Sequence, residues 1–95
     1  MNQEILKKLK ELKPVLKEKF GIEEFAVFGS VARGEDNENS DIDIAVIKAV
    51  KKDYFKLLDA KYFLSDVLKR DIDIGYFDGI RPIIKKYIQK DLINV

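Results

Sequence analysis

Two aspartates separated by one residue, Asp41 and Asp43, have the type and spacing that most directly suggest chemistry. On a β-strand, residues i and i+2 point to the same face and lie about 6.5–7 Å apart. Two carboxylates on one face repel each other unless a cation lies between them, and Mg²⁺ prefers such oxygen ligands. The pair therefore indicates a metal site. The alternative is an acidic strand face that only meets solvent.

A second candidate site is the segment Gly29-Ser30-Val31-Ala32-Arg33-Gly34, which follows a short apolar stretch. A strand that runs into Gly-Ser and a helical turn presents free backbone N–H groups to which a phosphate can bind. Glycine lets the phosphate approach the backbone closely, the Ser30 hydroxyl adds a donor, and Arg33 adds a fixed positive charge. The alternative is an ordinary tight connection between a strand and a helix.

The sequence Asp-Ile-Asp-Ile occurs at residues 41–44 and again at residues 71–74. If the second copy forms a strand beside the first, a third carboxylate can join the same cluster. That carboxylate could complete metal coordination and accept a proton from an attacking hydroxyl. The alternative is an amphipathic strand whose acidic residues face solvent.

The composition of the 95 residues restricts the chemistry, because the chain contains neither cysteine nor histidine. This excludes disulfides, a thiolate nucleophile, imidazole metal ligands and Ser–His–Asp catalysis. Residues 21–46 hold seven acids and one arginine between two basic segments, so the net charge of +1 conceals an acidic middle. No apolar run reaches about 18 residues, so we expect a cytoplasmic protein that does not cross a membrane.

The pattern of apolar residues predicts one small domain of class α/β (α+β) over residues 1–95, with a mixed three- or four-stranded sheet flanked by helices. Asn2 and Asp53 are expected to cap helices, Gly21 to end the first helix, and Pro14 to kink or split it. The expected helices cover 2–20, 54–69 and Pro82 to about Lys90, and the expected strands cover 24–28, 41–47, 71–76 and 92–95.

Two further groups have weaker interpretations. Asp36, Glu38 and Ser40 are spaced like part of a calcium loop but lack its glycine and final glutamate, so a solvated loop is favoured. The aromatic residues of the second long helix have helical spacing and are interpreted as core and interface rather than as a platform for stacking bases. They are Tyr54, Phe55, Tyr62 and Phe63.

Taken together, the Gly-Ser turn, the Asp-x-Asp strand and the third acidic strand resemble the DNA polymerase β-like nucleotidyltransferase superfamily. The segments 28–34 and 40–44 resemble in particular the minimal nucleotidyltransferase (MNT) group, and the resemblance covers nearly the whole chain. It implies phosphate binding by Gly29, Ser30 and Arg33, and catalysis and metal binding by Asp41, Asp43 and Asp73. Asp71 is the alternative third carboxylate.

The resemblance also implies the reaction and the partner. AMP would pass from ATP to a hydroxyl, with two Mg²⁺ ions stabilising the attacking and leaving oxygens. Members of the MNT group are typically antitoxins that adenylylate a tyrosine of a HEPN-domain toxin, so a hetero-oligomer or a homo-oligomer is expected. The alternatives are a passive binding module for a HEPN partner and a subunit of a small-molecule (antibiotic-type) nucleotidyltransferase. The acidic middle disfavours direct binding of nucleic acid.

Overall fold

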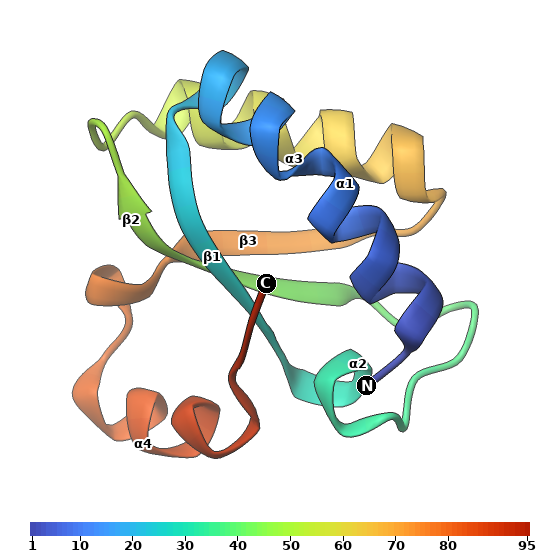
Figure 1. Ribbon diagram of the computed structural model, residues 1–95. Helices are drawn as coiled ribbons and strands as arrows, with labels where there is room; N and C mark the ends of the chain where they lie inside the picture. The colour runs from blue at the N-terminus through green and yellow to red at the C-terminus, as the bar shows by residue number, and fades with distance from the viewer.

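A mixed four-stranded sheet with helices on both sides forms the centre of the computed structural model, which describes residues 1–95 (Figure 1). This confirms the expected fold class. In chain order the elements are α1 (Gln3–Phe20), β1 (Ile22–Phe28), α2 (Gly29–Arg33), β2 (Ile42–Ala49), α3 (Tyr54–Leu68), β3 (Ile72–Tyr76), the 3₁₀ helix η1 (Phe77–Gly79), α4 (Pro82–Asp91) and β4 (Ile93–Asn94).

The strand order in the sheet is β3-β2-β1-β4. β1 pairs antiparallel with both β2 and β4, whereas β2 and β3 are parallel and are joined through α3. In Figure 1, α1 and α3 lie together on one side of the sheet and α4 lies on the other. The parallel pair brings the two Asp-Ile-Asp-Ile segments side by side.

The hydrophobic core lies between the sheet and the pair α1 and α3. In β2, Ile42, Ile44 and Val46 are buried in this core, because alternate residues of a strand face the same side. Asp43 lies between them and is only half-buried. The register of the core therefore turns Asp43 toward the face opposite α1 and α3.

Helix α1 begins and ends where the sequence predicts, but Pro14 does not split it. The Asn2 side chain accepts a hydrogen bond from the Ile5 N–H, and Gly21 ends the helix in the left-handed conformation with φ of 68°. Helix α1 continues through Pro14 from Gln3 to Phe20, so of the two expected outcomes, a kink or a split, the split is wrong. The core contacts of Leu9 and Leu16, which lie on either side of Pro14, stabilise the continuous helix despite the missing N–H.

The aromatic residues of α3 are mostly outside the core, contrary to the part of the prediction that assigned them there. Tyr54, Phe55 and Tyr62 are 71%, 84% and 62% exposed, and only Phe63 packs against the core. Leu57, Ala60, Leu64 and Leu68 form the buried side of this helix. The helix has 3.6 residues per turn, so the three exposed aromatic residues lie away from that side.

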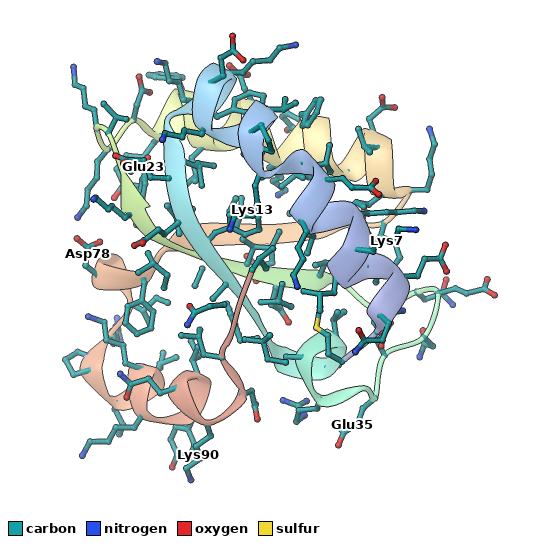
Figure 2. All side chains as sticks on the ribbon, in the orientation of Figure 1. Lys7, Lys13, Glu23, Glu35, Asp78 and Lys90 are labelled. Carbon is teal, nitrogen blue, oxygen red and sulfur yellow. The ribbon has the colours of Figure 1, made fainter.

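Charged side chains project outward from the helices and loops, as the labelled Lys7, Glu35 and Lys90 illustrate (Figure 2). Lys48 and Lys52 are exposed, and their ammonium groups lie 3.9 Å from Glu23 and 2.6 Å from Asp78. None of the helices is both long and apolar enough to span a bilayer.

Candidate active site

Asp43 and Asp73 occupy neighbouring positions on two parallel strands. In the β2–β3 register, Asp43 is opposite Asp73, with the pairs Ile42–Ile72 and Ile44–Ile74 on either side. The backbone N–H of Ile42 donates to the Asp71 carbonyl, with an N···O distance of 2.9 Å, where the two strands begin. Paired positions of adjacent strands face the same side of the sheet, so the two carboxylates share the face opposite the core.

Gly29 lies directly against the Asp43 carboxylate. On the other side of β2, Asp43 is opposite Phe28, the last residue of β1, and Gly29 follows at once. The backbone of Gly29 has φ of +74°. A Cβ atom at this position would overlap Asp43 Oδ2 and would lie 3.2 Å from Asp43 Cγ. The predicted phosphate turn and the predicted metal ligand are therefore in direct contact, and only glycine leaves room for both.

Burial raises the pKa of Asp43, and the negative charges of Asp73 and Asp41 raise it further. The positive charge of Arg33 partly opposes this increase. Without a bound cation, the ionised form of Asp43 is thus less favourable in the folded protein than in an aspartate exposed to solvent.

A groove of about 430 Å³ opens beside these acids. Its acidic lining residues lie at the N-terminal ends of β2 and β3 and are Asp41, Asp71 and Asp73. The other lining residues are Ile72 of β3 and Lys61, Tyr62 and Ser65 of α3. Asp41 lies just before β2 and is exposed, rather than within the strand as predicted. Both candidates for the third carboxylate line the groove, but only Asp73 is the register partner of Asp43.

The donors fit a divalent cation of the magnesium type. No group of three acidic side chains is close enough together to hold a metal ion unaided. Mg²⁺ usually binds through one or two carboxylates and keeps water or phosphate oxygens as its other ligands. The carboxylates of Asp41, Asp43 and Asp73 could supply the protein share of such a site, and the cation would relieve their repulsion.

Arg33 is engaged in two ion pairs. Its Nε donates to Glu35 Oε2 at 2.9 Å, and its Nη1 donates to Asp91 Oδ2 at 2.8 Å. The hydrogen bond to Glu35 makes the largest contribution to raising the pKa of the guanidinium, and the hydrogen bond to Asp91 raises it further. These contacts link α2 to the end of α4, so the predicted contact of Arg33 with a phosphate would require exchange of these partners.

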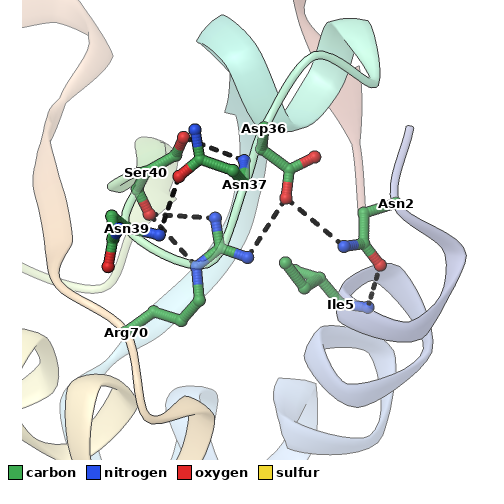
Figure 3. A network of polar contacts seen from close by, with 7 residues as sticks. All are labelled: Asn2, Ile5, Asp36, Asn37, Asn39, Ser40 and Arg70. Atoms are coloured by element: carbon green, nitrogen blue, oxygen red, sulfur yellow. Dashed lines mark hydrogen bonds and ion pairs between the residues drawn. The ribbon is translucent and has the colours of Figure 1, made fainter.

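Arg70 is a residue of this region that the sequence patterns did not indicate. Its guanidinium bonds to Asp36 and to the carbonyl of Ser40, the residue before Asp41 (Figure 3). Asp36 is therefore an ion-pair partner, which agrees with the preference against a calcium loop. The only signal in the sequence was an arginine immediately before Asp71, and one arginine at one position predicts no contact.

Comparison with known proteins identifies the family. Residues 9–95 match the nucleotidyltransferase domain family. A relative from Methanocaldococcus jannaschii, named as a protein adenylyltransferase, is 43% identical over 88 residues, which are 92% of this chain and 90% of the relative. The chain belongs to the nucleotidyltransferase domain family.

Two solved structures share the fold of this nucleotidyltransferase. A structure named as a minimal nucleotidyltransferase has a TM-score of 0.79 and 29% identity, with 100% of this chain and 97% of that chain covered. A toxin–antitoxin structure with AMP-PNP has a TM-score of 0.73 and 23% identity, with 99% and 72% covered. The second similarity concerns the fold. The expected membership of the MNT group is confirmed.

Proposed function

We propose that this nucleotidyltransferase moves AMP from ATP to a hydroxyl of a partner protein, with Asp41, Asp43 and Asp73 as its catalytic and metal-binding residues. The observation that carries the proposal is the register of β2 and β3, which sets Asp43 beside Asp73 while Asp43 also touches Gly29. Carboxylates beside a glycine turn suit the transfer of a phosphorus-centred group, since that chemistry depends mainly on positioning and charge neutralisation.

Mg²⁺ bound to these carboxylates would supply positive charge to the attacking and leaving oxygens. Gly29 leaves space for a triphosphate oxygen near the backbone, and the half-buried Ser30 hydroxyl would donate a hydrogen bond to it. The acceptor oxygen would form a bond to the α-phosphorus of ATP while the bond to the β-phosphate oxygen breaks and diphosphate leaves. Asp73 would accept the proton of the acceptor hydroxyl.

We place the acceptor on a protein because the M. jannaschii relative is named as a protein adenylyltransferase. The toxin–antitoxin structure with AMP-PNP supports a toxin as that protein and ATP as the nucleotide. We therefore propose a HEPN-domain toxin as the partner and one of its tyrosines as the acceptor. Modification of the toxin would make this chain an antitoxin that acts in the cytoplasm.

The test is transfer of label from α-³²P-ATP, in the presence of Mg²⁺, to the protein encoded by the neighbouring gene. We expect label on that protein, and we expect Asp73→Asn to lower the rate by about 10²–10⁴-fold because the proton acceptor is lost. Glu38→Gln is the matched control, since Glu38 is an exposed acid in the loop before β2 and forms no ion pair. Tight binding without label, or full activity of Asp73→Asn, would contradict the proposal.

A further inference from the structure

Arg70 connects the two chain segments that lead into the acidic strands. It follows the end of α3 and immediately precedes Asp71, at the entrance to β3. Its Nε and Nη2 atoms both donate to the Ser40 carbonyl, at 3.1 and 2.9 Å. Ser40 immediately precedes Asp41, at the entrance to β2. The guanidinium of Arg70, two residues before β3, is therefore bonded to Ser40, two residues before β2, and both strands carry candidate catalytic acids.

The third contact of Arg70 is an ion pair removed from solvent. Nη1 donates to Asp36 Oδ2 at 3.1 Å, and the Arg70 and Asp36 side chains are only 12% and 7% exposed. The same Asp36 oxygen accepts from Asn2 Nδ2 at 3.4 Å, and Asn2 caps α1 (Figure 3). Burial alone would raise the pKa of Asp36, but the hydrogen bonds from Arg70 and Asn2 together lower it below the ordinary value. Asp36 is thus ionised and fixed at neutral pH.

The loop at residues 36–40, which Arg70 contacts, also has hydrogen bonds between its own residues. The Asn37 N–H donates to the Ser40 hydroxyl, and the Ser40 N–H donates to the Asn37 carbonyl, both at 3.0 Å. These two bonds close the turn at residues 37–40, and the Ser40 carbonyl at its end accepts two N–H groups from the planar Arg70 guanidinium. The direction of the chain at the next residue, Asp41, depends on this carbonyl.

From this geometry we infer that Arg70 is a positioning residue, which aims the Asp41 carboxylate at the cation and nucleotide through its bonds to the Ser40 carbonyl. The inference rests on the proposed role of Asp41. Removal of an outer partner of a metal ligand typically weakens metal binding by 10–100-fold, and we expect a loss of about that size when the Ser40 contact is removed.

The test uses three variants, because Arg70→Met alone would leave the enclosed Asp36 charge without its cation and could unfold the chain. Asp36→Asn removes the charge partner but keeps the two bonds from Arg70 to the Ser40 carbonyl. The double variant Asp36→Asn/Arg70→Met removes both charges and those bonds. Arg70→Lys keeps the charge but has no planar fork. Lys69→Ala is the matched control, since the neighbouring Lys69 is exposed and pairs only with the exposed Asp66.

The first readout is Mg²⁺ affinity in the presence of AMP-PNP, measured by calorimetry. We expect Asp36→Asn and Lys69→Ala to remain within about threefold of the wild type, and Arg70→Lys and the double variant to bind about 10–100-fold more weakly. The second readout is amide exchange of Ile42, whose N–H bonds to Asp71 between the two strand entrances. We expect exchange to be at least about tenfold faster in Arg70→Lys, which corresponds to about 1.4 kcal/mol.

Wild-type Mg²⁺ affinity in both Arg70→Lys and the folded double variant would overturn the inference. Equal weakening by Asp36→Asn and by the double variant would also overturn it, because the ion pair and not the carbonyl contact would then be responsible. These results are separable from the proposed reaction. A wild-type chain that binds Mg²⁺ and AMP-PNP but labels no protein contradicts protein adenylylation and leaves the role of Arg70 intact.

Discussion

Gly29 and Gly34 have the same left-handed backbone, with φ of +74° at both positions, but their surroundings differ. A Cβ atom at Gly34 would meet only the Met1 nitrogen, at 3.5 Å, whereas one at Gly29 would collide with the Asp43 carboxylate. The two residues therefore separate backbone strain from a direct effect on the candidate site.

We predict that Gly29→Ala and Gly34→Ala both lose about 1–2 kcal/mol of unfolding free energy from the left-handed conformation. Gly29→Ala should lose more, and its AMP transfer should fall by at least about 100-fold because Asp43 is displaced. Urea unfolding and the labelled-ATP assay measure the two effects, with Gly34→Ala as the control that keeps its activity. Equal activity of the two variants would show that the contact of Gly29 with Asp43 is unimportant.

Helix α1 contains Pro14 in its interior, and Pro14 is exposed. Proline in a helix interior is about 3 kcal/mol less favourable than alanine, because it removes a hydrogen bond and crowds the preceding turn. We predict that Pro14→Ala raises the unfolding free energy by about 1–3 kcal/mol without a change in AMP transfer, as measured by urea unfolding. A lower stability would mean that the path of α1 over the sheet depends on the proline.

Strands β2 and β3 could be predicted well because their alternation of acidic and aliphatic residues reflects a physical requirement. Ile42 and Ile44 have to be buried, so the intervening Asp43 has to face the other way. The helix caps at Asn2 and Asp53 could be predicted from residue type, because these side chains satisfy N–H groups that every helix leaves free.

The contacts of the two arginines near the site could not be predicted, because they depend on where distant elements end. Arg33 pairs with Asp91 only because α4 returns toward α2, and Arg70 meets Ser40 only because β2 and β3 are parallel and aligned. Local patterns contain no information on either arrangement. The exposure of Phe55 was missed because spacing defines a helix face but does not say what covers it.

Considered as a whole, the molecule has an acidic middle segment between two basic segments, and Asp41 and Asp43 of the middle segment lie beside Asp71 and Asp73 where β2 and β3 begin. The raised pKa of Asp43 has a consequence for overall stability. A carboxyl group with a higher pKa in the folded chain than in the unfolded chain lowers stability when it is ionised. This loss develops as the pH rises from the unfolded pKa, about 3.8, through the folded pKa, and is complete above it.

We predict that Asp43→Asn has a melting temperature about 2–5 °C above that of the wild type at pH 7, although it should be inactive. The difference should shrink as the pH falls and should vanish below the ordinary range of aspartate, where both chains are uncharged at this position. Thermal unfolding between pH 3 and pH 7 measures it. A variant that is less stable than the wild type at pH 7 would contradict repulsion and burial as the cause of the raised pKa.

The parallel pairing of β2 with β3 also affects the order of folding. Strands β1 and β2 are antiparallel, and only α2 and a loop separate them in the sequence. Strand β3 is parallel to β2, and the whole of α3 lies between these two strands in the sequence. Contacts between segments far apart in sequence close slowly, so the Asp43–Asp73 pair should assemble after β1 has paired with β2. Nucleotide binding would then be restricted to chains in which β3 has joined β2, and titration with AMP-PNP would count that fraction of a preparation.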